Sequence, residues 1–174
     1  MFRSNGIFRD VLLYKTGNNS IYDFEAKISF KSLFSLDFLP SLKISDDCVL
    51  SVLLYDDGEI VSSKSVNVSP SNIEKISFDN LDVHKWSAEC PYLYDLIIIL
   101  SKGEDVIEVV RKNIGFKNVE IIGNKFLFNN EPIKLLGVNH HDTNAKTGYV
   151  MSVEDMELDV SLVTVSYTHL RAHE

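Results

Sequence analysis

The chain has 174 residues, of which 45% are hydrophobic and 24% charged, which suits one or two small globular domains. Its net charge of −8 comes without a stripe of Lys and Arg interleaved with aromatic residues, which argues against a nucleic-acid partner. The longest apolar run, residues 96–100, is far below the ~20 residues of a membrane helix, so no membrane association is expected.

The amino terminus and the two cysteines bear on the cellular compartment. Residues 1–5 are too polar to begin a secretory signal peptide, so we expect a cytoplasmic protein. In a disulfide-bonded immunoglobulin domain the packing Trp follows the first Cys closely, whereas Trp86 lies just before Cys90. Because a cytoplasmic protein keeps its thiols reduced, we predict that Cys48 and Cys90 are free and buried.

Alternating apolar and polar residues mark the first half of the chain. Residues 22–30 alternate strictly, which predicts a half-buried strand. Residues 49–55 and 59–68 flank the Asp-Asp-Gly sequence at 56–58, and an Asp-Gly pair supplies the positive φ angles of a tight hairpin turn. Residues 73–78 predict one more strand.

A second hairpin is predicted further along, with strands at 94–100 and 106–111 and a longer loop at 101–105. The six strands follow one another at regular spacing. This spacing is typical of an antiparallel sandwich of roughly one hundred residues. We therefore expect an immunoglobulin-like domain at residues 15–113.

The pattern changes after Arg111. Short strands are predicted at 119–122 and 125–128, followed by an almost wholly apolar strand at 133–138. A strand buried on both faces has this composition. Polar residues then crowd its carboxyl end, at 139–142, and in a (β/α)8 barrel the active site lies at that end of the strands.

A helix is predicted after this strand. Ser152, with Asp155 three residues later, resembles a capping box. Apolar residues then recur at helical spacing, at Met156, Val160 and Val163. This face would pack against the strand to form a first β-to-α unit, with residues 139–148 as the loop that helps to form the site.

Four stretches of sequence carry a resemblance to a known family. They are NGIFRDV at 5–11, WSAECPYLY at 86–94, IGFKNVE with FLFNNEPI between 114 and 133, and GVNHHD with GYVM between 137 and 151. In this order and at these separations they resemble glycoside hydrolase family two, and within it the β-galactosidases most closely.

The resemblance implies a mainly β fold, an immunoglobulin-like β-sandwich followed by the first strand and helix of a truncated (β/α)8 TIM barrel. A whole barrel needs ~250 residues, so we expect a fragment. Its expected parts are 1–14, the end of a sugar-binding jelly-roll domain; 15–113, the sandwich; 114–162, the start of the catalytic barrel; and 163–174, a non-native tail. The two histidines of that tail are given no ligand role.

The resemblance also implies the activity of a parent enzyme, a bacterial hydrolase of terminal non-reducing β-galactosides that retains configuration. Retaining glycosidases need two carboxylates ~5 Å apart, and the family takes both, as glutamates, from later barrel strands. No catalytic residue, metal ligand or cofactor is therefore expected in the fragment, which should be inactive. For the parent the resemblance implies Mg²⁺, with Na⁺ as a second candidate ion, and a homo-oligomer.

Three residues are candidates for substrate binding. His141 matches a motif histidine of the family, and the resemblance implies that it contacts galactosyl hydroxyls. Asn139 would fix the loop through backbone bonds, and Asp142 would either orient His141 or cap the loop. A His141 held by nearby backbone is the alternative. His140 stands where Arg is common in the family.

Other functions stay open at this point. Within the same family they are β-glucuronidase and β-mannosidase, although residues 5–11 and 86–89 favour a β-galactosidase. From a different class, a non-catalytic sandwich that binds carbohydrate or protein would leave residues 114–162 without a purpose. Trp86 and Tyr92 could stack on sugar rings, but packing in the core or between domains is the preferred interpretation.

Overall fold

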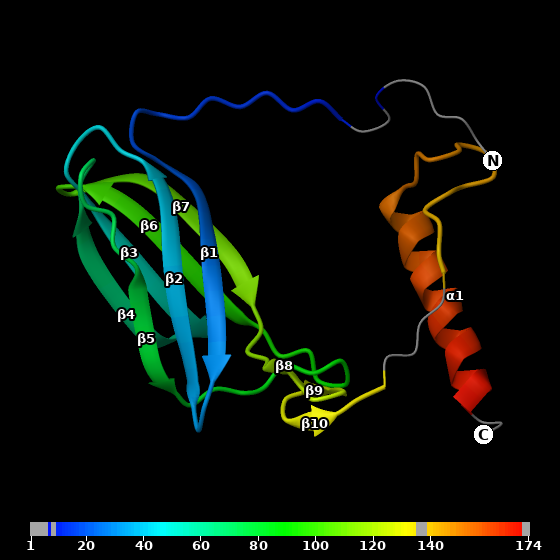
Figure 1. Cartoon of the computed structure of the whole chain (residues 1–174). Coiled ribbons are helices and arrows are strands. Elements are labelled where there is room, and N and C mark those ends of the chain that lie inside the picture. The colour runs from blue at the N-terminus through cyan, green and yellow to red at the C-terminus, as the bar shows by residue number, and fades with distance from the viewer. Residues whose placement is uncertain (1–6, 8–9, 135–138, 172–174) are drawn as a thin grey trace. The chain divides into compact units, whose positions relative to one another are not determined.

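The computed structural model describes residues 7, 10–134 and 139–171, with side chains described as far as residue 163. The chain divides into two compact units (Figure 1). One is Lys15–Lys134, and the other combines Met1–Tyr14 with Leu135–Glu174. No helix in the described part is long and apolar enough to cross a membrane.

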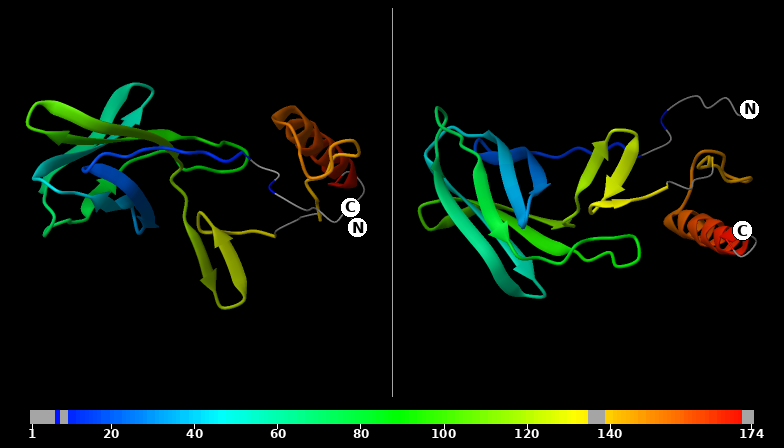
Figure 2. Two further views of the ribbon diagram at one scale, coloured as in Figure 1. Left: turned by 90° about the horizontal axis from the view of Figure 1, so that it is seen from above. Right: turned by 60° about the horizontal axis from the view of Figure 1, so that its bottom comes forward.

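The first unit contains a seven-stranded antiparallel sandwich. Its two sheets have the strand orders β1-β2-β5 and β4-β3-β6-β7 and lie face to face (Figures 1 and 2). The strands are β1 (Ser20–Phe30), β2 (Phe34–Lys43), β3 (Cys48–Asp56), β4 (Glu59–Val68), β5 (Ile76–Leu81), β6 (Tyr94–Lys102) and β7 (Asp105–Ile114). This architecture confirms the predicted immunoglobulin-like sandwich.

The core lies between the sheets, because successive residues of a strand face opposite sides. The central strands β3 and β6 bury every second residue along most of their length, and β2 does so over its first half. Fully buried side chains include Leu36, Phe38, Leu50, Val52, Leu54, Leu96, Ile98 and Leu100. Phe116, just past β7, is also fully buried and packs edge-on against Phe34 and Tyr94, so the core extends beyond the boundary expected at 113.

Tyr94 fixes the connection that leads into β6. Its hydroxyl accepts a hydrogen bond of 2.8 Å from the backbone N–H of His84. This resembles the tyrosine corner of immunoglobulin domains, in which a Tyr near the start of the equivalent strand binds the backbone upstream. Tyr94 is only 2% exposed, and burial raises the pKa of its phenol.

The turns follow local sequence closely. Asp57 and Gly58 join β3 to β4 with φ angles of 44° and 89°, which confirms the predicted hairpin. The β6–β7 turn also uses a glycine, Gly103, at φ 62°, but both strands run further into it than expected. Both cysteines are free, as predicted. Cys48 is buried, whereas the prediction that Cys90 is buried was wrong, since Cys90 lies exposed in the connection before β6.

A small third sheet, of strand order β10-β9-β8, belongs to the same unit. Its strands are β8 (Val119–Ile122), β9 (Lys125–Phe128) and β10 (Glu131–Pro132). Asn129 and Asn130 turn between β9 and β10 with φ angles of 52° and 72°, values that Asn tolerates better than most residues. The two short strands predicted at 119–122 and 125–128 are thus confirmed.

The second unit contains the helix α1, Val153–Arg171. The predicted capping box is present, because the N–H of Asp155 donates to Ser152 Oγ at 3.1 Å and the N–H of Ser152 donates to Asp155 Oδ2 at 3.3 Å. Hydrogen bonds at this terminus, from its own backbone N–H first and from Ser152 second, lower the pKa of Glu154. The helix continues past residue 162, into the segment 163–174 that was interpreted from the sequence as a non-native tail.

The first β-to-α unit is only partly described. Most of the strand predicted at 133–138 lies outside the described residues, and Ile133 and Lys134 are not in a strand. On the helix, Met156 and Val163 are half-buried, whereas Val160 is 66% exposed. The predicted apolar face is therefore not fully covered.

Candidate functional site

The candidate site is the 139–148 loop, which precedes α1. Asn139, His140, His141 and Asp142 are all exposed and lie in irregular structure. Gly137 and Val138, the start of the same motif, lie outside the described residues. The loop therefore presents two imidazoles, an amide and a carboxylate to solvent, which are groups that hydrogen-bond to hydroxyls.

His140 has a carboxylate beside each of its two ring nitrogens. Its Nε2 lies 3.1 Å from Asp159 Oδ2, and its Nδ1 lies 3.3 Å from Asp142 Oδ1. Asp142 therefore pairs with His140, a contact that was not predicted from the sequence, and the two roles weighed for Asp142 stay predictions. Asp159, on α1, was not singled out from sequence, where nothing distinguishes it from the other acidic residues of the helix.

His141 and Asn139 differ from His140 in the part of the loop that the structure describes. Within the described residues, no hydrogen bond or ion pair involves the side chain of either. The alternative interpretation, a His141 held by nearby backbone, remains a prediction, because residues 135–138 of that backbone lie outside the described residues. Both side chains are exposed and accessible to a ligand.

The rest of the loop is closed by its own hydrogen bonds. Asn144 and Gly148 exchange two backbone hydrogen bonds of 2.7 and 2.9 Å, and the side chain of Asn144 accepts from the N–H of Lys146 at 2.8 Å. Gly148 has φ 69°, a conformation that favours glycine. The Thr147 hydroxyl donates to the carbonyl of Val150. The loop is thus a compact turn that returns the chain to α1.

Trp86 is a packing residue. One side of its ring meets Gly115, the Lys117 ammonium lies 5.0 Å from the ring centroid, and the Phe128 ring packs edge-on at 5.9 Å. The amide of Asn129 also donates to the Trp86 carbonyl at 3.0 Å. These contacts join the sandwich to the small sheet and confirm packing as the role of Trp86.

Tyr92 is likewise engaged within the sandwich. Its hydroxyl donates to Asp56 Oδ1 at 2.6 Å, and its ring packs against His84 at 4.7 Å and Tyr94 at 5.2 Å. The hydrogen bond to Asp56 is the main cause that raises the pKa of Tyr92 to about 12. A ring so engaged is a packing residue, as predicted, and not a free platform for a sugar.

The described residues hold no group of three or more His, Cys, Asp and Glu side chains that could bind a metal ion. His140 has two carboxylates beside it, but they approach opposite ring nitrogens. Such an arrangement bridges elements of the protein and does not converge on one ion.

The fold is that of a β-sandwich module followed by a small sheet, a polar loop and a capped helix. Two family models match the chain. Residues 44–117 match "Glycosyl hydrolases family 2", and residues 119–168 match "Glycosyl hydrolases family 2, TIM barrel domain". The chain belongs to glycosyl hydrolase family 2.

Curated relatives agree with this assignment. The chain is 33% identical over 171 residues to a β-galactosidase of Streptococcus thermophilus, covering 93% of this chain and 16% of that protein. It is 34% identical over 166 residues to a β-galactosidase large subunit of Leuconostoc lactis, covering 92% of this chain and 26% of that protein. The chain therefore spans about a sixth to a quarter of the length of these relatives.

Solved structures show the same fold. A β-glucuronidase from Ruminococcus gnavus superimposes with a TM-score of 0.71 at 21% identity, covering 84% of this chain and 24% of that chain. The likeness confirms the mainly β architecture.

Proposed function

We propose that the chain is part of a β-galactosidase that hydrolyses terminal β-galactosides with retention of configuration. The observation that carries this proposal is the 33% identity to the Streptococcus thermophilus β-galactosidase over 93% of the chain. The similarity to β-glucuronidase structures, at 21% identity, supports the fold alone.

His141 is proposed to bind the sugar. Its imidazole is exposed beside Asn139 and Asp142, and no hydrogen bond within the described residues occupies it. A ring nitrogen can donate to a sugar hydroxyl, and such a bond assists catalysis when it strengthens as the oxocarbenium-like transition state forms. Asn139 and Asp142 complete the proposed substrate-binding set.

The remaining chemistry is assigned to other parts of the whole protein. We propose that two glutamates outside these 174 residues act as nucleophile and as general acid and base, so that the chain alone is inactive. Mg²⁺, with Na⁺ as a second candidate, would also bind elsewhere, since the described residues offer no matching cluster. A homo-oligomeric, cytoplasmic bacterial enzyme completes the proposal.

The test is to clone the full gene that contains this sequence and to assay its product on p-nitrophenyl β-D-galactoside, β-D-glucuronide and β-D-mannoside. Preference for the galactoside, with the β-anomer of galactose appearing first by NMR, supports the proposal. Preference for another glycoside or α-anomer first would overturn the substrate or the stereochemistry. A product inactive on all three would favour a non-catalytic module, to be tested by carbohydrate binding.

A further inference from the structure

His140 joins two elements that are separate in sequence. It belongs to the 139–148 loop, and its Nε2 reaches Asp159 on α1 across 19 positions of sequence. Its Nδ1 faces Asp142, two residues along the same loop. A neutral imidazole has one N–H, whereas the protonated ring donates from both nitrogens. Each carboxylate thus faces one possible donor of the same ring.

The contacts of His140 with Asp142 and Asp159 involve both residues that flank His141 in the sequence. His140 and Asp142 are its two neighbours in the chain, and their side chains contact each other at 3.3 Å. The contact between His140 and Asp159 then attaches residues 140–142 to α1, which is held rigid by its own backbone hydrogen bonds. Holding both neighbours restricts the backbone at His141, whose own imidazole is not occupied by any residue in the described part of the chain.

We propose that His140 is a positioning residue, which ties the 139–148 loop to α1 through Asp159 and so fixes the direction in which His141 is presented. The role assigned to His141 rests on the proposed function, whereas the tie between the loop and the helix does not. The proposal gives the second histidine of the His-His pair a purpose distinct from that of the first.

Because the three side chains are partly exposed, their contacts can position the loop while contributing little to the stability of the fold. The side chains of His140, Asp142 and Asp159 are 41%, 65% and 36% exposed. Ion pairs this exposed contribute little to global stability, because solvent screens them. Variants at these positions should therefore remain folded, and their effect should be local to the loop.

The first experiment measures amide hydrogen exchange in the 174-residue chain. His140→Gln and Asp159→Asn should each accelerate exchange in peptides that cover residues 139–148, because the loop loses its attachment. Glu157→Gln is the matched control, since it removes the same charge from α1 without touching His140. Equal exchange in all four proteins would overturn the tie.

The second experiment uses the full-length gene product and its best p-nitrophenyl glycoside. His140→Gln and Asp159→Asn should lower kcat/KM by about tenfold to a hundredfold, because a displacement of ~1 Å in a positioned group can have an effect of that size. His140→Arg should restore most of the loss, since a guanidinium can also donate to two carboxylates. A purely structural role would not be rescued in this way.

The outcomes of the two experiments distinguish an error in the positioning role from an error in the proposed function. If His140→Arg is as impaired as His140→Gln, or if neither variant affects kcat/KM, the positioning role is wrong even when the enzyme is an active galactosidase. If the full-length protein hydrolyses no glycoside, the proposed function fails, and the exchange measurement still decides whether His140 ties the loop to α1.

Discussion

A Cβ atom added to Gly115 would lie 2.7 Å from Cδ1 of Trp86 and 2.9 Å from Cγ. Non-bonded carbon atoms do not approach this closely, so the absence of a side chain at Gly115 is what allows the indole to lie against the backbone. The same indole contacts Phe128 of the small sheet. A single glycine thus permits the packing that joins the sandwich to that sheet.

Gly115→Ala should therefore destabilise the protein. Overpacking of this kind typically costs about 1–3 kcal/mol, because the ring or the backbone must shift. Urea unfolding followed by Trp fluorescence measures the change directly, since Trp86 is the only Trp of the chain. Gly17→Ala is the control, because its nearest neighbour would be Asn19 O at 3.4 Å. Equal stability of the two variants would contradict the argument.

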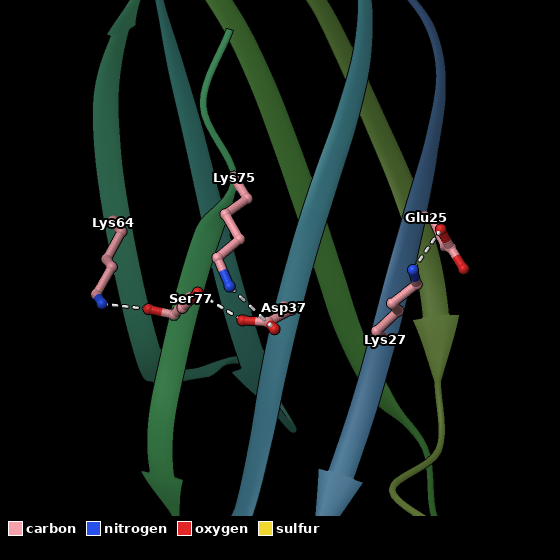
Figure 3. Close-up of polar contacts among 6 residues, drawn as sticks. All are labelled: Glu25, Lys27, Asp37, Lys64, Lys75 and Ser77. Atoms are coloured by element: carbon pink, nitrogen blue, oxygen red, sulfur yellow. Dashed lines mark hydrogen bonds and ion pairs between the residues drawn. The ribbon is translucent and has the colours of Figure 1, made fainter.

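The acid dependence of stability should involve Asp37. A hydrogen bond of 2.5 Å from the Ser77 hydroxyl is the main cause that lowers the pKa of Asp37, and Lys75, at 3.3 Å, adds to it (Figure 3). A group whose pKa is lower in the folded state stabilises the protein above its unfolded pKa, about 3.9 for Asp. That contribution disappears as the pH falls through the folded pKa.

Asp37→Asn should accordingly be less stable than the parent at pH 6, with a gap that closes on acidification below about pH 4. The gap should be small, since the Asp37 side chain is 40% exposed and its ion pair is screened. Urea unfolding at a series of pH values tests this. Asp79→Asn, at an exposed position on the same strand as Ser77, is the control for removal of a surface carboxylate from this strand. A gap for Asp37→Asn that does not vary with pH would refute the linkage.

Local sequence signals were sufficient for most of the sandwich, but β2 was not predicted. Pro40 lies within it and lacks the N–H that a central strand needs. The structure resolves this conflict because β5 pairs only with residues 34–38 of β2, so Pro40 lies beyond the three-stranded part of the sheet. The strand predicted at 73–78 begins only at Ile76, after a turn in which Ser69 and Asn72 exchange hydrogen bonds.

The candidate site was predictable only in part. The motif around His141 could be found because its residues are contiguous. The contact between His140 and Asp159 could not, because it joins residues 19 positions apart on different elements and depends on the orientation of both side chains. Pairings of this kind are tertiary, and no period or spacing in the sequence encodes them.

The two units should behave differently in solution. The first unit has a buried hydrophobic core, whereas the described helix of the second unit and the segment before it expose most of their large apolar side chains, at Val150, Val153, Leu158, Val160 and Leu162, with exposures of 51% to 66%. Such surface favours association. We expect the whole chain to self-associate and a protein of residues 15–134 to be a folded monomer, as measured by light scattering after size exclusion.

A matched variant isolates the cause of that association. Leu158→Gln with Leu162→Gln removes two exposed leucines one helical turn apart without shortening the chain. It should reduce self-association of the full chain. A full chain that is monomeric at the same concentration, or limited proteolysis that leaves no protected fragment near 15–134, would contradict this division into units.

His141→Ala provides the most direct test of the proposed sugar contact in the full-length enzyme. If the bond to a galactosyl hydroxyl strengthens in the transition state, its loss should lower kcat and kcat/KM together while leaving KM nearly unchanged. Removing one partner of such a hydrogen bond costs about 1–3 kcal/mol, which corresponds to roughly a fivefold to a hundredfold loss. His84→Ala, in the sandwich unit, is the control and should retain the parental kcat. A rise in KM alone would instead mean that His141 binds the ground state and the transition state equally, and unchanged kinetics would remove it from the site.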